Sequence, residues 1–123
     1  MYDQELIREI LQQIHHASLT VLERFEPIKK VEDFTSSSAG AEKLDAICMQ
    51  LIAIGESLKR LDKLTNGELL GNYPEIDWKG AKGMRDVISH HYFDVDAEII
   101  YSVCQKKIGP LSQTIHKILN QLG

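Results

Sequence analysis

A stretch from Ser38 or Ala39 to Asp62 carries apolar residues on more than one side of a helix, and it constrains the fold more than any other feature. One apolar stripe recurs at steps of three and four residues, and a second stripe lies beside it. The two stripes are Leu44, Cys48, Leu51, Gly55 and Leu58, and Ile47, Ile54 and Leu61. Such a helix must be covered on several sides, so we expect it in the middle of a bundle.

Gly55 and Glu56 stand out inside this helix. Glycine there is less favourable than alanine by about 1 kcal/mol, and a close crossing of a neighbouring helix would explain its presence. Glu56 follows at the edge of the apolar face. Two interpretations of it stay open: it orients a basic group on the next helix, or it is a solvated glutamate.

The N-terminal segment from Tyr2 to Phe25 predicts one long helix, with Asp3 near its start where a carboxylate suits the helix dipole. Its buried face is predicted to consist of Ile7, Ile10, Ile14, Ala17 and Val21. His15 and His16 lie beside this face and point in different directions, because adjacent residues do not share a face. Surface histidines are the simplest interpretation of both.

The remaining segments alternate between turn signals and helical patterns. We expect a loop from Ile28 to Gly40, and turns from Lys63 to Ile76 with a short helical turn near Glu68. Three further helical stripes are predicted: a third helix that Asp77 caps, a fourth that begins at Asp94 or Asp96, and a final stripe after Gly109-Pro110.

The predicted fold class is therefore all-α: an up-and-down bundle of four main helices, the last one divided near Gly109-Pro110. The length of 123 residues, with 43% hydrophobic and 26% charged residues, fits one domain over residues 1–123 with a single core. The abundance of Leu, Ile, Glu, Lys and Gln also favours helix over sheet.

The net charge and the two cysteines limit which classes of function fit this chain. The net charge of -4 argues against a broad basic surface for long nucleic acids, so an RNA would have to be met locally or by an assembly. Cys48 and Cys104 lie in apolar runs without metal-ligand spacing, which favours core thiols. No apolar run approaches the length of a membrane span, and we expect a cytoplasmic protein without a membrane partner.

The segment from Gly83 to Phe93 gathers the residues best suited to chemistry, namely Arg85, His90 and Tyr92. Arginine offers a fork of donors that can grip a phosphate, and histidine titrates near neutral pH. Together they suffice for phosphodiester cleavage without a metal or another cofactor. From spacing alone, however, a helix end whose polar residues face water remains the simpler interpretation.

Geometry limits how these side chains can cooperate. On a continuous helix Arg85 and His90 are roughly 140° apart around the axis and about 7.5 Å apart along it. Either the helix distorts near His90, or a second copy of the protein completes the site across a two-fold axis, so we expect a homodimer. Asp86 is four residues before His90 and can touch it, which would fix the orientation of the imidazole.

The spacing of Arg85, His90 and Tyr92 resembles the signature of the HEPN superfamily, specifically its HepT-like toxins. The resemblance covers nearly the whole chain, and its specificity comes from the combination of this motif, the flanking segments and the helical layout. The flanking segments are Ile54-Gly55-Glu56, Pro74-Glu75-Ile76-Asp77-Trp78 and Gly83-Met84-Arg85-Asp86.

The resemblance implies a metal-independent endoribonuclease toxin, acting on tRNA, mRNA or another RNA as a dimer. Its partner would be a minimal nucleotidyltransferase antitoxin that transfers AMP onto the motif tyrosine. Carried over by position, Arg85 and His90 become catalytic, Asp86 supports them and Tyr92 is modified, whereas His91 falls at a variable position. The acidity of the chain departs mildly from what RNA cleavage suggests.

A competing hypothesis is a non-catalytic helical module that binds a nucleotide or docks a nucleotidyltransferase through the same residues. Fold does not fix function, so the sequence leaves this alternative open. Without the resemblance, Tyr92 would be interpreted as a tyrosine that packs its ring at the end of the third helix.

Overall fold

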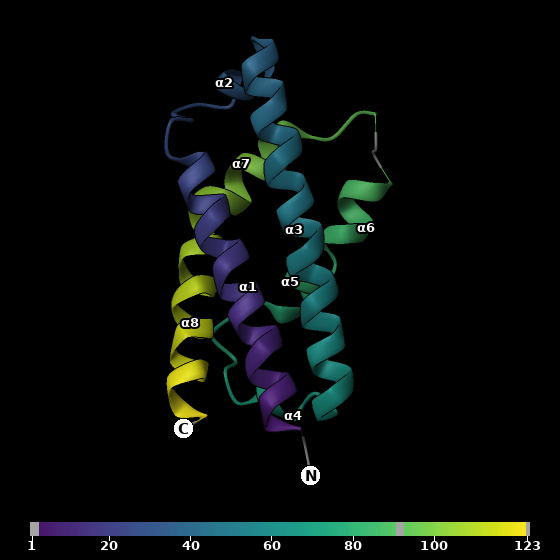
Figure 1. Cartoon of the computed structure of the whole chain (residues 1–123). Coiled ribbons are helices and arrows are strands. Elements are labelled where there is room, and N and C mark those ends of the chain that lie inside the picture. The colour runs from purple at the N-terminus through teal and green to yellow at the C-terminus, as the bar shows by residue number, and fades with distance from the viewer. Residues whose placement is uncertain (1–2, 91–92, 123) are drawn as a thin grey trace.

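The computed structural model describes residues 3–90 and 93–122, and every regular element in those ranges is a helix. These elements are α1 (Gln4–Phe25), α2 (Glu32–Thr35), α3 (Ser38–Thr65), α4 (Glu68–Gly71), α5 (Trp78–Lys82), α6 (Met84–Ser89), α7 (Ala97–Lys106) and α8 (Ile108–Gln121). The long helices α1, α3 and α8 lie side by side, and both termini are at the end of the bundle that holds α4 (Figure 1). The predicted all-α class is confirmed.

Helix α3 is the central element, as its two apolar stripes predict. It packs against α1, α2, α4, α5, α6 and α7. Ile47, Leu58 and Leu61 are fully buried in it. Helix α1 covers one side of α3 and also contacts α8, and its predicted face of Ile7, Ile10, Ile14, Ala17 and Val21 is buried.

Polar side chains cap the helices where the sequence leads one to expect them. Asp3 accepts a hydrogen bond from the Leu6 amide at 3.0 Å, and Asp77 accepts one from the Gly80 amide at 3.0 Å. Asp96 starts α7 in the same way, which selects it over Asp94. Each carboxylate satisfies an amide that has no partner inside its helix.

Helix α3 begins at Ser38 as predicted, but its predicted end at Asp62 and the predicted loop before it were wrong. The helix continues past Asp62 to Thr65, whose buried hydroxyl donates to the Leu61 carbonyl at 2.9 Å. Asn66 caps the C-terminal end of the helix in a left-handed conformation with φ 54°. Before α3, the predicted loop from Ile28 to Gly40 contains the short helix α2.

Helix α2 forms because Phe34 is buried, at 1% exposure, although polar residues surround it in the sequence. The Asp33 carboxylate accepts a hydrogen bond from the Lys29 amide at 2.8 Å, which closes the turn before the helix. A single apolar residue among charged ones gives no periodicity. The loop prediction therefore failed for lack of a pattern.

The predicted third helix is divided at Gly83 into α5 and α6. The last helix is divided near Gly109-Pro110 as predicted, although the point of division is Lys107. Pro110 instead occupies the first turn of α8. Proline is tolerated there because the first amides of a helix have no partner within it.

Both cysteines are buried core thiols, as predicted. Burial raises the pKa of Cys48 to about 11 and that of Cys104 to about 12, with smaller contributions from Asp45 to the first and from Cys48 to the second. No helix within the described ranges combines the length and apolarity needed to cross a membrane.

Candidate functional site

The short helix α6 presents the predicted site residues on the surface of the bundle. Ile88 is buried, at 5% exposure, and anchors α6, which packs against α3. Arg85, Asp86 and His90 are exposed around this anchor. Tyr92, predicted to be modified, lies outside the described residues, as does His91.

Arg85 is held by an acidic residue of the central helix. Its Nε atom lies 2.9 Å from Oε1 of Glu56, and the two side chains are 53% and 43% exposed. Of the two interpretations of Glu56, the structure supports the one in which it orients a basic group on a later helix. The ion pair uses the Nε side of the guanidinium. The terminal amino groups form the other end of the fork, which suits a phosphate.

The helix crossing predicted from Gly55 is present at this point. A Cβ atom built on Gly55 would lie 3.1 Å from the Ala81 carbonyl oxygen and 3.3 Å from that of Lys82. It would also lie 3.7 Å from the Arg85 amide nitrogen. The backbone of α3 therefore touches the junction of α5 and α6 immediately before Arg85, and only a glycine allows so close an approach without a shift.

A second ion pair, which the sequence did not predict, joins α3 to α5. Lys82 at the end of α5 pairs with Asp62 of α3, and the side chains are only 29% and 22% exposed. The two residues are twenty positions apart on different helices, so no local spacing connects them. The Oδ1 atom of Asp62 is buried and makes no hydrogen bond within the described part of the chain.

His90 ends α6 without distorting it. Its φ and ψ angles of -68° and -19° are helical, and its amide donates to the Asp86 carbonyl at 3.0 Å. The roughly 140° between Arg85 and His90 expected for a regular helix therefore holds up to this residue. Among the described residues, no side-chain hydrogen bond joins Asp86 to His90, so the predicted support of the imidazole by Asp86 is not formed here.

A hollow of about 430 Å³ lies beside the motif, between α6 and α7. Its lining includes Val87, Val95 and Ile99, with Asp94 and Asp96 at its polar edge. Val87 is 42% exposed and Ile99 is 44% exposed, which is high for apolar side chains of this size. The surface next to the motif is therefore partly apolar.

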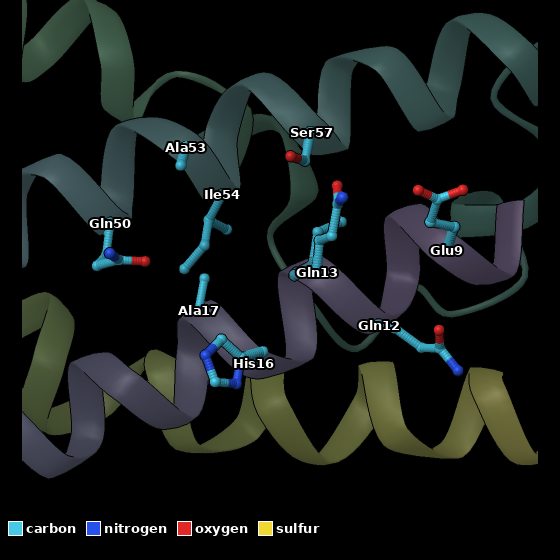
Figure 2. Close-up of a pocket in the computed structure, with 10 residues that line it drawn as sticks. Glu9, Gln12, Gln13, His16, Ala17, Gln50, Ala53, Ile54 and Ser57 are labelled. Carbon is cyan, nitrogen blue, oxygen red and sulfur yellow. The ribbon is translucent and has the colours of Figure 1, made fainter. Parts of the chain in front are cut away.

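A groove of about 420 Å³ between α1 and α3 is separate from the motif (Figure 2). Its floor is apolar, and Ile54 points from α3 toward Ala17 of α1 (Figure 2). The other lining residues are mostly polar: Glu9, Gln12, Gln13, His16, Gln50 and Ser57. Uncharged amides on a helix surface give no distinctive sequence signal, which is why the sequence did not predict this groove.

No cluster of three or more histidine, cysteine, aspartate or glutamate residues in the described ranges is arranged to hold a metal ion. The groups at α6 that are suited to chemistry are the Arg85 guanidinium and the imidazole of His90 at the end of the helix. These groups can bind a phosphate and transfer a proton.

Comparison with known proteins gives a consistent result. The profile of the family described as Ribonuclease HepT-like matches residues 5–118. A protein of Methanocaldococcus jannaschii named "Putative RNase" is 30% identical over 103 residues, which are 79% of this chain and 82% of the relative. The "Probable ribonuclease HepT" of Thermococcus cleftensis is 27% identical over 99 residues, 76% of this chain and 86% of the relative.

A longer protein of M. jannaschii, named "Gamma-glutamylcyclotransferase and putative RNase", is 31% identical over 105 residues. The match covers 85% of this chain but 44% of that protein. No solved structure matches the chain significantly.

Proposed function

The chain belongs to the HepT-like ribonuclease family, and on that premise we propose that it is a metal-independent endoribonuclease with Arg85 and His90 as catalytic residues. The observation that carries the proposal is the half-exposed guanidinium of Arg85, which an ion pair with Glu56 holds by its Nε atom. An oriented guanidinium on the surface is suited to a phosphate of a polynucleotide. In this proposal the protein meets RNA in the cytoplasm.

The proposed reaction is an internal attack within RNA. His90 takes the proton of a ribose 2′-hydroxyl, the 2′-oxygen bonds to the adjacent phosphorus, and the bond to the 5′-oxygen of the next nucleotide breaks with a proton delivered to that oxygen. Arg85 stabilises the negative charge that builds up on the phosphate. The products are a 2′,3′-cyclic phosphate and a 5′-hydroxyl.

Cleavage of total RNA and tRNA in the presence of EDTA tests this proposal. His90→Ala should lower the rate by about 10²- to 10⁴-fold, which is typical for loss of a proton-transfer group. His16→Ala, which removes an exposed histidine of α1, is the matched control and should cleave like the wild type. Equal cleavage by wild type and His90→Ala, or none by either, would contradict the proposal.

The regular geometry of α6 supports a site shared between two copies. A helix distortion near His90 was one of two ways to bring Arg85 and His90 together, and the backbone is helical through His90. The other way is a homodimer in which residues of two copies face one groove, which also doubles the local positive charge. We therefore include a two-fold homodimer in the proposal.

The partly apolar hollow between α6 and α7 is the proposed contact surface of this dimer. Val87 and Ile99 expose apolar area there that a second copy would cover. Ile99→Glu should produce a monomer in sedimentation experiments. Leu19→Glu on α1, where the native side chain is similarly exposed at 46%, should remain a dimer. A wild type that is a monomer at micromolar concentration and fully active would contradict the shared site.

The proposed regulator is a minimal nucleotidyltransferase antitoxin that transfers AMP to Tyr92. The support is the family membership and the position of Tyr92 two residues after His90. A phosphate added there would compete with RNA for Arg85. After co-expression with the partner, intact mass should increase by AMP units in the wild type but not in Tyr92→Phe. AMP additions that persist in Tyr92→Phe would assign the modification to another residue.

Toxicity on expression separates this proposal from a non-catalytic binding module. Growth arrest that disappears in Arg85→Ala supports the ribonuclease. Harmless expression with retained binding of the nucleotidyltransferase supports the module instead.

A further inference from the structure

We propose that Glu56 is the positioning residue of the catalytic arginine: it fixes the Nε side of Arg85 so that the two terminal amino groups face the scissile phosphate. This inference rests on the proposed ribonuclease function. It assigns a role to a residue of the central helix that lies outside the arginine, histidine and tyrosine motif.

The ion pair leaves the terminal edge of the Arg85 guanidinium available. Oε1 of Glu56 lies 2.9 Å from Nε of Arg85, a distance typical of a charge-assisted hydrogen bond. Arginine binds carboxylates and phosphates best through two parallel donors, and one such edge consists of its two terminal amino groups. A carboxylate placed on Nε restricts the rotation of the side chain and directs that terminal edge away from α3.

The helices that carry the two residues of the ion pair are in close contact. Gly55 brings the backbone of α3 against the carbonyl oxygens of Ala81 and Lys82, and a Cβ atom there would lie 3.1 Å and 3.3 Å from them. Glu56 is the next residue of the same long helix. The carboxylate and the arginine backbone are therefore held by two helices in direct contact, so the ion pair has a defined geometry.

The neighbouring ion pair of Asp62 and Lys82 is less exposed than the pair of Glu56 and Arg85. Asp62 and Lys82 join α3 to the neighbouring helix α5, and their side chains are 22% and 29% exposed. The Glu56 and Arg85 side chains are 43% and 53% exposed. Exposed ion pairs contribute little to stability, so a structural role suits the Asp62 pair better. Glu56 and Arg85 are exposed enough to meet a substrate.

A carboxylate next to a phosphate site also weakens substrate binding, and this second effect can be measured separately from the first. The negative charge of Glu56 repels the substrate, while its hydrogen bond orients Arg85. Glu56→Gln removes the charge but keeps an oxygen that can accept from Nε. Glu56→Ala removes both. A positioning role therefore separates the two variants in kcat, and loss of the charge lowers KM in the glutamine variant.

The test measures kcat and KM for a short RNA substrate in wild type, Glu56→Gln, Glu56→Ala and Glu75→Ala. Misplacing a catalytic group by about 1 Å can cost on the order of 100-fold in rate, so we expect Glu56→Ala to lose about 10- to 100-fold in kcat with an unchanged melting temperature. Glu56→Gln should recover most of that loss with a KM below the wild type. Glu75 pairs with Lys117 at 4.0 Å and is 49% exposed, so Glu75→Ala is the matched control and should keep wild-type kcat and KM.

A second measurement does not depend on RNA cleavage. In an NMR spectrum of the arginine side chains, the Arg85 Nε–H signal should exchange slowly with water in wild type and Glu56→Gln, and rapidly in Glu56→Ala. Wild-type kcat in Glu56→Ala, or an Arg85 signal that this variant leaves unchanged, would overturn the inference. A wild type that cleaves no RNA would instead overturn the proposed function, so the two failures are distinguishable.

Discussion

The three long helices and the α5–α6 segment are held in place by different interactions. Helices α1, α3 and α8 bury continuous apolar faces, and α1 packs against both α3 and α8. In α5 and α6 only Trp78 and Ile88 are buried, and Ala81 and Met84 pack against the core while partly exposed. The Gly55 crossing and two ion pairs also join this segment to α3. The long helices supply the stability, and the short segment positions polar groups at the surface. Changes in the two regions should therefore separate stability from activity.

The largest expected effect is on the free energy of unfolding, and it tests the role of the long helices in stability. Leu58 of α3 is fully buried, so Leu58→Ala should lower the free energy of unfolding by about 2–5 kcal/mol through lost burial and a cavity. Lys79 of α5 is exposed and lies outside the proposed dimer contact, and Lys79→Ala should change it by about 0.5 kcal/mol or less. Urea unfolding of the two variants measures both values. Equal destabilisation would show that the site segment is as much a part of the core as α3.

The second prediction concerns the contact between the two regions. Gly55→Val places a branched side chain where a Cβ atom already lies 3.1 Å from the Ala81 carbonyl oxygen. Overpacking of this kind costs about 1–3 kcal/mol, and it should also push Arg85 away from Glu56. We expect a moderate loss of stability together with a loss of RNA cleavage.

Gly109→Ala is the matched control for this glycine. It also lies in a helix, but a Cβ atom there meets no atom within 4 Å. Alanine is favoured over glycine in helices by about 0.5–1 kcal/mol, so this variant should be neutral or more stable. A Gly55→Val protein with wild-type stability and cleavage would mean that the crossing does not constrain the site.

The same contrast explains what the sequence could predict. The long helices have apolar residues at regular spacing over many turns, so their presence and the central place of α3 follow from periodicity. The break at Gly83 and the short helix around Phe34 depend on single residues and on tertiary contacts. Periodicity does not report such features, and the boundaries there were wrong.

For the site, the sequence identified the residue types, and Gly55 and Glu56 indicated a crossing and an ion pair that the structure contains. It could not predict the pairing of Asp62 with Lys82, because partners on different helices have no fixed spacing in sequence. The catalytic roles of Arg85 and His90 stay predictions until cleavage is measured.

The smallest expected effect is a pH dependence of the stability, and it originates between the long helices α1 and α8. The His15 ring of α1 stacks on the His116 ring of α8, with centroids 5.3 Å apart and planes at 30°. Burial lowers the pKa of His15 below its ordinary value of 6.5, and repulsion from His116 and His16 lowers it further. The folded protein therefore binds a proton at His15 less readily than the unfolded chain does.

Because the unfolded chain binds more protons below about pH 6.5, this contribution to stability is complete above that pH and is lost as the pH falls through the lowered pKa of His15. His15→Gln should make the decrease in stability between pH 7.5 and 5.5 shallower, as measured by urea midpoints at constant m-value. His16→Gln, at the exposed neighbouring position, should change this slope less. Repulsion from His16 is the smallest of the three causes that lower the pKa of His15. If His15→Gln and the wild type show the same slope, the histidine pair between α1 and α8 is not the source of the pH dependence.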